Sequence, residues 1–393
     1  MTDNGRIVEF VITRFQFARD RVVGDSQVMA DQVNLASLEL ISDQGNRGLG
    51  FISSLFHTLP SQAELTRLFT EEAWPAIEGE EAASLALRVT RPRGGNVRRM
   101  SLPFEEAIQQ ACWDLFSKSM NMPLWRLLGA KRDCLPAYAS GLDFHLSDDD
   151  FCAFFARAAE QGFRAFKVKV GHPDLDRDIH RLDLLARIRS RDSIIMVDAN
   201  EAWSAKQAIS ALNAMRRAGH EIYWVEDPVL RTDFDGLRLI RESTPGTLVN
   251  AGEYLDVPGK RALLQARALD VLNVHGQITD VMRVGWLAAE LGIPLSAGNS
   301  WCDIGLSVAL AQPDLKWFEY SYQNVDHLVE EPFRISGGLI QASHSPGHGL
   351  TLSAVARQDY AQPQVLVADE VALPAASRSS LDELTRRGIP QPA

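Results

Sequence analysis

The stretch IIMVDANEAWSAKQAISALNAMRRAGHEIYWVEDP, residues 194–228, contains two short apolar runs separated by one amphipathic segment. The runs at 194–199 and 222–226 have the length of buried strands, and each carries a carboxylate at its end. The segment between them begins with Ser204, a good helix cap, and ends with Gly219, a common helix stop. A strand, a helix and a second strand in this order predict one β–α–β unit of a parallel sheet.

The same alternation extends over most of the chain from about residue 137. The predicted strands are Ala137–Leu142, Ala165–Val170, Ile194–Ala199, Ile222–Glu226, Leu248–Gly252, Val271–His275, Pro294–Ala297 and Trp317–Tyr320. Helix-like segments lie between them, such as DDDFCAFFARAAEQG at 148–162. Eight strands that alternate with helices predict an α/β fold, a parallel (β/α)8 barrel. A doubly wound open sheet is the structural alternative.

The first 130 residues or so have a different pattern. IVEFVITRFQF at 7–17 and VNLASLELISDQG at 33–45 alternate apolar and polar residues, which predicts antiparallel strands. PFEEAIQQACWDLFSKSMNMPLWRLLGA at 103–130 has apolar residues at helical spacing. We therefore predict an α+β capping domain, a barrel domain, and a C-terminal segment that returns to the capping domain, at residues 1–135, 136–352 and 353–393. The last residues, 385–393, are expected to fray.

The composition limits the classes of function. The formal net charge of -11 argues against a nucleic-acid binder, which needs a basic surface, and no polybasic patch suggests a membrane partner. No run of about 20 apolar residues could span a bilayer, and the start, MTDNG, lacks the pattern of a signal peptide. The four cysteines, Cys112, Cys134, Cys152 and Cys302, show no CxxC spacing. These features predict a cytoplasmic enzyme whose cysteines are reduced core thiols.

Three carboxylates follow three consecutive predicted strands. Asp198, Glu226 and Glu253 are 28 and 27 residues apart, and the carboxyl ends of barrel strands share one face. Like charges that converge there repel one another unless a cation lies between them. Ligand sets made only of oxygen favour a hard cation, so the sequence predicts a Mg²⁺ site. The alternative, that these residues cap the following helices, fits Asp227 better than Glu226.

Two lysines lie on the strand that precedes this triplet. In AFKVKVGHP, residues 165–173, Lys167 and Lys169 are two positions apart and therefore share one face of a strand. Their ammonium groups would repel each other, which a sequence avoids unless the repulsion is useful. The alternative is that both alkyl stems line the barrel while the charged ends reach solvent. The carboxylate triplet on the neighbouring strands favours a catalytic role instead.

These motifs together resemble those of a known family. FKVKVG, VDANEAW, VEDP and AGE, in this order and spacing, resemble the enolase superfamily in its mandelate racemase and muconate lactonizing enzyme branch. The segment at 107–130 resembles the family's helix before the barrel. SPGHGLTL resembles the segment after it, although His348 stands at an apolar position of the family pattern. The resemblance covers nearly the whole chain. It implies an enolase-like modified barrel whose capping loops, around 15–25 and 45–57, close over the substrate.

The resemblance implies a role for each residue at the strand ends. The three carboxylates would bind Mg²⁺, which would hold the carboxylate of a small-molecule substrate. An ordinary lysine has a pKa of about 10.4, too high for a base at neutral pH. Lys169 is the implied base, and Lys167 would lower its pKa and contact the substrate carboxylate. Asn200 would hydrogen-bond the substrate. Glu319, after the eighth strand, is either a hydrogen-bond donor to that carboxylate or a polar residue of the barrel rim.

The opposite face of the predicted site departs from the family pattern. Mandelate racemase-like enzymes have an aspartate after the sixth strand and a histidine after the seventh, whereas the muconate lactonizing branch has a lysine after the sixth. Here DVLNVH places His275 after the sixth strand, and Gly298 or Asn299 stands where the seventh-strand histidine is expected. We hypothesise that His275 alone is the acid/base opposite Lys169. The alternative is a histidine that is hydrogen-bonded in the site and chemically idle.

The sequence thus predicts Mg²⁺-dependent abstraction of the proton α to a carboxylate. Dehydration of an acid sugar to a 2-keto-3-deoxy acid is the first choice, a racemase or epimerase the second and a lactone cycloisomerase the third. A catalytically silent homologue that binds metal and ligand is the alternative of another class. The resemblance also implies a homo-oligomer. In the capping loops Arg19, Arg21 and Asp25 predict a polar distal end of the substrate. Five further histidines have no predicted partners, and most of them are expected on the surface or in loops: His57, His145, His172, His344 and His348.

Overall fold

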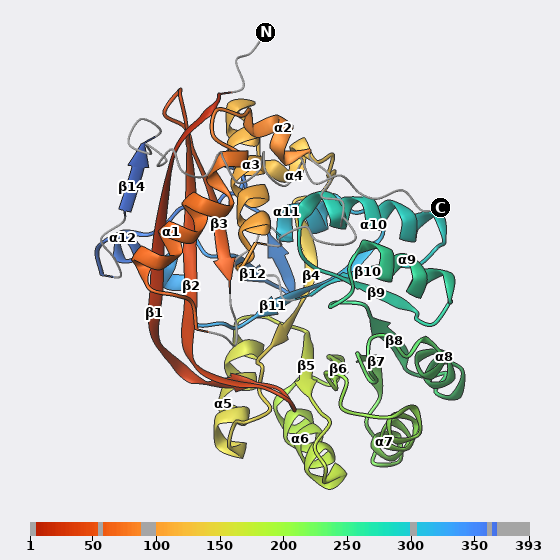
Figure 1. Ribbon diagram of the computed structural model, residues 1–393. Helices are drawn as coiled ribbons and strands as arrows, with labels where there is room; N and C mark the ends of the chain where they lie inside the picture. The colour runs from red at the N-terminus through yellow and green to blue at the C-terminus, as the bar shows by residue number, and fades with distance from the viewer. Residues whose placement is uncertain (1–4, 54–57, 88–99, 299–304, 360–363, 368–393) are drawn as a thin grey trace, which may run out of the picture.

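A computed structural model describes residues 5–53, 58–87, 100–298, 305–359 and 364–367 of the chain. Its strands form a closed parallel barrel and a separate antiparallel sheet (Figure 1). Four features of the sequence analysis fall outside these residues: His57, Asn299, Cys302 and the C-terminal residues 385–393. None of the described helices has the length and apolar character that crossing a bilayer requires.

In the described residues the barrel consists of eight parallel strands, β4 to β11, in sequential order. They are β4 (Cys134–Ser140), β5 (Ala165–Lys169), β6 (Ile194–Asp198), β7 (Ile222–Glu226), β8 (Leu248–Ala251), β9 (Val271–Val274), β10 (Leu295–Ala297) and β11 (Leu315–Ser321). β11 pairs in parallel with β4, so the sheet closes on itself. The predicted (β/α)8 barrel is therefore confirmed, and the doubly wound open sheet is excluded.

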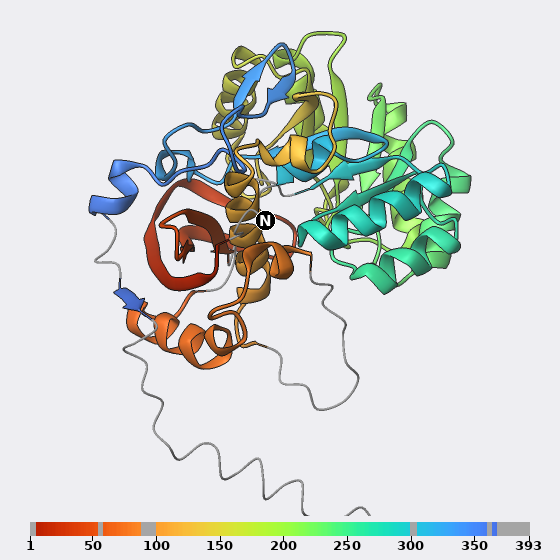
Figure 2. The ribbon, with the colours of Figure 1, turned by 90° about the horizontal axis from the view of Figure 1, so that it is seen from above.

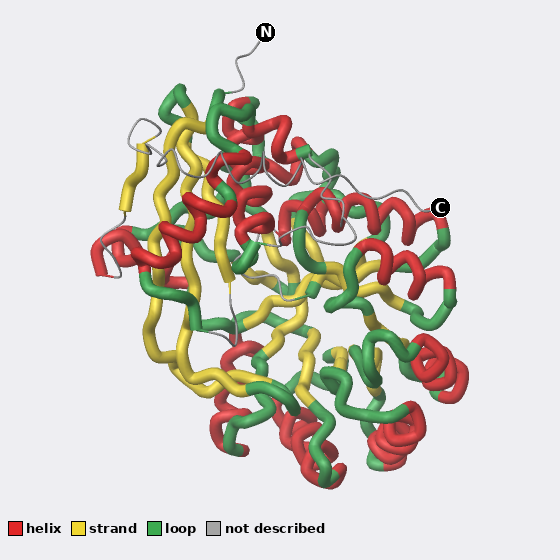
Figure 3. The backbone as a smooth tube through the Cα atoms, viewed as in Figure 1, coloured by secondary structure: helices red, strands yellow, loops and turns green. Residues whose placement is uncertain are grey.

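Helices follow the barrel strands and cover the outside of the barrel (Figure 3). They are α5 (Asp148–Glu160), α6 (Leu175–Ile188), α7 (Ala205–Arg217), α8 (Phe234–Ser243), α9 (Val257–Gln265), α10 (Ile278–Glu290) and α11 (Gly305–Leu310). The predicted cap of α7 is a capping box between Ser204 and Gln207. Its residues Ala208, Leu212 and Met215 share one face and are buried, which fixes the helix on the barrel.

Large side chains fill the amino-terminal half of the barrel interior. Tyr138, Ala165, Met196 and Trp224, from four different strands, form one buried cluster. The rings of Tyr138 and Trp224 meet edge to face with their centroids 5.4 Å apart. This buried cluster packs beneath the polar residues at the carboxyl ends of the same strands and supports them.

The capping sheet has the order β14-β1-β2-β3 and is antiparallel. Its strands are β1 (Ile7–Gly24), β2 (Met29–Ser42), β3 (Arg47–Ser53) and β14 (Gln364–Val367). Helix α3 (Phe104–Ser119) lies along the curled strands (Figure 2). A Cβ at Gly48 or Gly50 would come within 2.1 Å of a carbonyl oxygen of α3, so this close approach requires glycine. The pairing of β14 with β1 confirms that the C-terminal segment returns to the cap, whereas the exact domain boundaries stay a prediction.

The remaining elements are short and lie near the cap and the end of the barrel. They are α1 (Gln62–Glu72), α2 (Ala82–Ala86), α4 (Leu124–Leu127), β12 (Arg334–Ser336), β13 (Leu339–Gln341), α12 (Ala354–Asp359) and 3-10 turns at Trp74–Ala76 and Asp326–Leu328. The helix expected over 103–130 is thus two helices, α3 and α4. Asn121 between them has a positive φ of 49°, and Pro123 immediately precedes α4. A helix does not continue through such a pair.

The capping segments expected as loops are mostly strand. Residues 15–24 belong to β1 and 47–53 form β3, while 54–57 lie outside the described residues. The long β1–β2 hairpin extends from the cap to the barrel (Figure 1). There the N–H of Gly24 donates to the carbonyl of Leu142 at 2.8 Å, and the Gln27 amide donates to the carbonyl of Asn200. The cap thus meets the candidate site through the end of a hairpin.

The charged residues of this hairpin have structural partners. Arg21 donates to the carbonyls of Gly141 at 3.0 Å and Tyr322 at 2.7 Å, which follow β4 and β11. Arg19 donates to another carbonyl after β11 at 2.6 Å. Asp25 accepts two N–H groups of its own turn. Arg19 and Arg21 thus tie the hairpin to the barrel, and Asp25 holds the turn of the hairpin. The polar distal end of the substrate that these residues suggested stays a prediction.

His348 lies in a loop, as predicted, but it is buried and not on the surface. Its imidazole is 1% exposed and packs under β3. The Nδ1 atom accepts the backbone N–H of Leu350 at 3.0 Å, and Nε2 lies 2.8 Å from the carbonyl of Leu49. Because Nδ1 is an acceptor, Nε2 must carry the single proton of a neutral ring. Two backbone partners therefore allow a histidine at this otherwise apolar position.

The structure predicts that His348 makes the protein less stable in acid. Burial is the main cause that lowers the pKa of His348, helped by Lys118 and opposed by Asp114. Below about pH 6.5 the unfolded chain binds a proton that the folded chain does not. The free energy of unfolding therefore decreases as the pH is lowered. In His348→Asn, its slope against pH between about 5 and 6.5 should be shallower than in the wild type. Urea unfolding at several pH values measures it. The same change at exposed His344 serves as the control, and an equal effect at both positions would contradict the prediction.

Candidate active site at the carboxyl ends of the barrel strands

The predicted site residues lie on consecutive barrel strands or directly after them. Lys167 and Lys169 belong to β5, and the register places Lys169 beside Asp198 and Asp198 beside Glu226. Glu253 lies two residues after β8 and His275 one residue after β9, while Glu319 lies within β11. The fold therefore brings the residues chosen from the sequence to one end of the barrel.

Lys167 is the centre of a buried ion cluster. Its Nζ lies 2.6 Å from Glu226 Oε1, 3.0 Å from Glu319 Oε1 and 3.2 Å from Asp198 Oδ2. The lysine side chain is 2% exposed, so its charge does not reach solvent. Burial alone would lower the pKa of Lys167, but the neighbouring carboxylates raise it well above the ordinary value. Both the charge and the position of this lysine are thus set by the carboxylates, and the solvent-reaching alternative is wrong for it.

Lys169 has a different set of partners. Its Nζ donates to Asp198 Oδ2 at 2.6 Å and to Asn200 Oδ1 at 2.7 Å. Burial is the largest influence and lowers the pKa of Lys169, and Lys167 lowers it further, as expected from the sequence. Asp198 and Glu319 act in the opposite direction, and the net effect raises the pKa. The charge of Lys167 therefore favours the neutral form of Lys169. In this arrangement the carboxylates, above all Asp198, have the larger effect and keep Lys169 charged.

The carboxylates differ in their electrostatic surroundings. Although burial raises it, the two lysines bring the pKa of Asp198 down to about 2. Burial, together with Asp198, Glu319 and Glu253, raises the pKa of Glu226 well above the ordinary value, although Lys167 opposes this. No hydrogen bond in the described part of the chain reaches the Glu253 carboxylate. Glu253 thus influences its neighbours by charge alone.

The donor set fits a hard divalent cation. The site holds the ammonium groups of Lys167 and Lys169 and four carboxylates, those of Asp198, Glu226, Glu253 and Glu319. If all six groups are ionised, a net charge of two negative units remains, and one divalent cation balances it. Asp198, Glu226 and Glu253 supply the oxygen ligands that Mg²⁺ prefers. The ammonium of Lys167 already lies between Asp198 and Glu226. In the described residues, no three His, Cys, Asp or Glu side chains are grouped as a ready metal site. The fit therefore rests on donor chemistry and charge.

Asn200 links Lys169 to a residue that the sequence analysis missed. A lysine ammonium only donates, so the amide oxygen of Asn200 faces Lys169 and its Nδ2 faces Tyr254 Oη at 3.3 Å. The guanidinium of Arg231 lies 4.4 Å from the centre of the Tyr254 ring and pairs with Glu201 at 2.7 Å. Tyr254 directly follows Glu253 in AGEY, which was the only signal for it.

The structure accounts for the glycine at Gly298, one of the two positions where the seventh-strand histidine was expected. Gly298 comes directly after β10, and a Cβ there would lie 2.5 Å from the side-chain oxygen of Asn273 on β9. Asn273 is fully buried, so the space for a larger seventh-strand side chain is already filled. His275 is half-buried beside a pocket of about 190 Å³, which Lys260 also lines.

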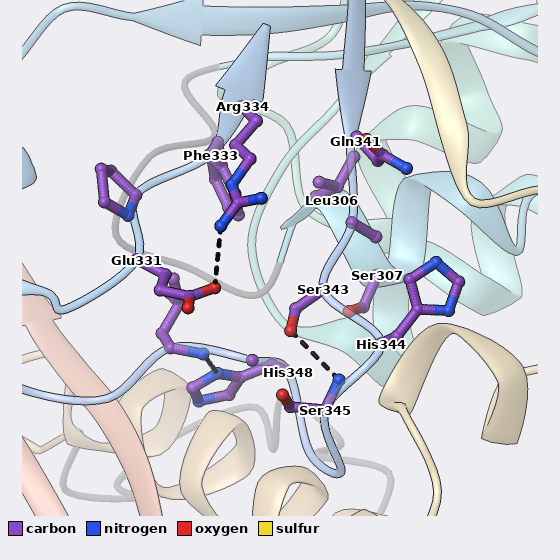
Figure 4. Close-up of a pocket in the computed structure, with 14 residues that line it drawn as sticks. Leu306, Ser307, Glu331, Phe333, Arg334, Gln341, Ser343, His344, Ser345 and His348 are labelled. Carbon is purple, nitrogen blue, oxygen red and sulfur yellow. Dashed lines mark hydrogen bonds and ion pairs between the residues drawn. The ribbon is translucent and has the colours of Figure 1, made fainter.

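A larger pocket lies away from the strand ends. It has a volume of about 400 Å³ and is lined by residues of α11, the β12–β13 hairpin and the segment 342–350 (Figure 4). Arg334 and Glu331 form an exposed ion pair of 3.4 Å at this pocket. None of the predicted catalytic or metal-binding residues contributes to it. The candidate chemistry therefore belongs to the barrel mouth.

Comparisons with known proteins agree with this fold. The family model described as "Enolase C-terminal domain-like" matches residues 150–356. The chain is 31% identical over 253 residues to 3,6-anhydro-alpha-L-galactonate cycloisomerase of Streptomyces coelicolor, covering 63% of this chain and 68% of that protein. It is 28% identical over 273 residues to L-talarate/galactarate dehydratase of Salmonella typhimurium, covering 67% of each. L-Ala-D/L-Glu epimerase of Bacillus subtilis is 29% identical over 199 residues, 49% of this chain and 53% of that protein. These relatives are enzymes.

Solved structures give the same result. A crystal structure of a Mesorhizobium loti protein, provisionally classed as a mandelate racemase, has a TM-score of 0.87 and 54% identity over 94% of this chain and 98% of that chain. A variant of an L-talarate/galactarate dehydratase, crystallised with Mg and L-glucarate, has a TM-score of 0.80 and 24% identity over 92% of this chain and 93% of that one. The chain therefore belongs to the enolase superfamily, in its mandelate racemase and muconate lactonizing enzyme branch.

Proposed function

We propose that this protein uses Mg²⁺ to abstract the proton α to the carboxylate of an acid sugar and dehydrates that sugar to a 2-keto-3-deoxy acid. The observation that carries the proposal is the buried cluster at the ends of β5, β6 and β7, where two lysines interleave with Asp198 and Glu226. The names of two relatives, a galactonate cycloisomerase and a talarate/galactarate dehydratase, support a sugar acid as the substrate.

Asp198, Glu226 and Glu253 would hold the ion. Bound Mg²⁺ would supply a positive charge that holds the substrate carboxylate and stabilises the negative charge that develops on it. Lys167 lies within the same cluster, so its ammonium would contact that carboxylate as well. Burial of these groups keeps water away, which strengthens each of these interactions.

Lys169 is the proposed base. Asp198 raises the pKa of Lys169 while the two are paired, so the neutral amine would form when Asp198 is engaged by the ion and the positive charges of the ion and Lys167 act on Lys169. The Nζ of that neutral amine takes the proton from the carbon next to the carboxylate, and the electron pair of the C–H bond forms the new double bond. Asp198 and Asn200 fix the direction of the amine through hydrogen bonds of 2.6 and 2.7 Å. Tyr254 fixes Asn200 in turn. This chain of contacts aims the base before the substrate arrives.

His275 completes the dehydration. The C–O bond at the β carbon breaks, and the leaving hydroxyl takes a proton from His275 in its charged imidazolium form, so that water departs and a neutral imidazole remains. The resulting enol rearranges to the 2-keto-3-deoxy acid. With a substrate that has no β-hydroxyl, the same imidazole could return a proton to the opposite face. The epimerase and cycloisomerase relatives therefore keep an isomerase as the second candidate.

Replacing His275 with asparagine separates the two halves of the proposed reaction. Dehydration should slow by about 100-fold or more, the usual contribution of a general acid. Exchange of the α-proton with solvent should continue, because Lys169 is intact. Product formation and deuterium uptake, measured by NMR on the same sample, report the two steps. His344→Asn, an exposed change elsewhere, is the control. Full dehydration by the His275 variant would show that this histidine is chemically idle.

A substrate panel tests the proposed function as a whole. The protein with Mg²⁺ is incubated in D2O with mono- and di-acid sugars, and proton NMR spectra are recorded. A new 3-deoxy methylene signal is expected for one member of the panel and would identify the substrate. Loss of the α-proton signal without that product would favour epimerisation. No change with any acid sugar would count against dehydration and favour the catalytically silent homologue.

A further inference from the structure

Lys260 lies in the first turn of α9 and is almost fully buried, with 4% of its surface exposed. Its Nζ donates to the carbonyl oxygens of Gly252 at 2.6 Å and Glu253 at 3.2 Å, and also to that of Leu255. An ammonium has three N–H donors, and these three carbonyls can accept all of them. The segment that they belong to is the turn between β8 and α9, which carries Glu253.

Three carbonyl oxygens that point to one place repel one another unless a cation lies between them. β8 ends at Ala251, and beyond it the Gly252 N–H donates to Asp227 Oδ1 at 3.3 Å and the Leu255 N–H donates to the Gly252 carbonyl at 3.1 Å. Neither of these bonds places a positive charge between the three carbonyl oxygens, as Lys260 does. Lys260 therefore stabilises the backbone conformation from residue 252 to residue 255 by contacts with three of its carbonyls.

Glu253 depends on this backbone more than the other two proposed ligands do. The carboxylate of Asp198 is hydrogen-bonded to Lys169, and that of Glu226 to Lys167 and to the Asn250 amide at 3.2 Å. No hydrogen bond of the described residues holds the Glu253 side chain. Its place in the site therefore depends on the backbone of the turn and on charge interactions, such as that with Lys167.

We infer that Lys260 is a positioning residue for Mg²⁺: its ammonium holds the turn 252–255 in the shape that presents Glu253 to the ion. This inference rests on the proposed function, since it takes Glu253 as a ligand. The ammonium of Lys260 is directed to the three backbone carbonyls, so it acts through Glu253 and is not itself a ligand. Removal of its charge would let the turn relax and would move one of three ligands.

The test is calorimetric titration of MgCl2 into protein freed of metal with EDTA and dialysed. The variants are Lys260→Met and, as a matched control, Lys118→Met. Lys118 also joins a carbonyl and a carboxylate, those of Arg47 and Asp114 at 2.8 and 2.7 Å, but it lies in the cap. We expect Lys260→Met to weaken Mg²⁺ binding by about 10- to 100-fold, the usual cost of losing a group that orients a metal ligand. Lys118→Met should bind Mg²⁺ as the wild type does.

Melting curves in EDTA show whether each variant is folded, which separates lost affinity from lost structure. If Lys260→Met does not fold, Lys260→Gln, which keeps a neutral donor, should show the same weakening to a smaller degree. A folded Lys260 variant with wild-type affinity would overturn the inference and leave the proposed function intact. A wild-type protein that binds no Mg²⁺ would overturn both.

Discussion

Replacing Lys169 with methionine should abolish dehydration almost completely. The proposed base is lost, and a general base contributes about 100- to 10,000-fold to a rate. The fold should survive, because methionine fills a similar volume and Asp198 keeps its second ion pair, with Lys167 at 3.2 Å. The turnover number on the substrate found in the acid-sugar panel measures the effect, with deuterium uptake at the α carbon as a second readout.

Lys118→Met, which removes a lysine from the cap, is the control for this experiment and should turn over normally. A Lys169 variant that still exchanges the α-proton at the wild-type rate would contradict the assignment of the base. Retention of exchange together with loss of product would place Lys169 in a later step.

Replacing Lys167 with methionine should destabilise the protein strongly when no metal is present. Asp198, Glu226 and Glu319 would lose the ammonium that lies within 3.2 Å of each of them. Removing one partner of a buried ion pair lowers the free energy of unfolding by about 3 to 5 kcal/mol, because the other charge stays buried without compensation. The midpoint of urea unfolding in EDTA measures the loss. Saturating Mg²⁺ should recover part of it, since an ion that binds only the folded state stabilises that state.

The same measurement on Lys118→Met provides the comparison. That lysine is 29% exposed, so its loss should cost less, and Mg²⁺ should not change the result. If Lys167→Met were as stable as the wild type in EDTA, the ion cluster would not be a buried network. If Mg²⁺ had no effect on its stability, the carboxylates would not be metal ligands.

The barrel could be predicted from the sequence because its signals are local. Each of the eight predicted strands appears at its place, with ends that differ by up to three residues, and α7 begins at the predicted Ser204 cap. The strand β3 was missed because RGLGFIS has glycines where strands usually have large side chains. Those glycines exist for the contact with α3, which lies about 60 residues later in the sequence.

The chemistry of the site was also predictable in part. The order of lysines and carboxylates along β5, β6 and β7 is readable from spacing, but their pairing is not. The contact between Lys169 and Asp198, which opposes the effect of Lys167 on the pKa, depends on strand register. Contacts between distant segments could not be predicted from the sequence either. An example is His348, which is buried and hydrogen-bonded to Leu49 of β3 and to Leu350.

Deuterium exchange at the α carbon, with and without metal, is the most direct experiment on the proposed chemistry. The wild type and Lys169→Met are each incubated with the acid sugar in D2O, in Mg²⁺ and in EDTA, and the product and remaining substrate are analysed by NMR. We expect proton loss only for the wild type in Mg²⁺. Equal loss in EDTA, or equal loss by the Lys169 variant, would contradict a Mg²⁺-dependent abstraction by Lys169.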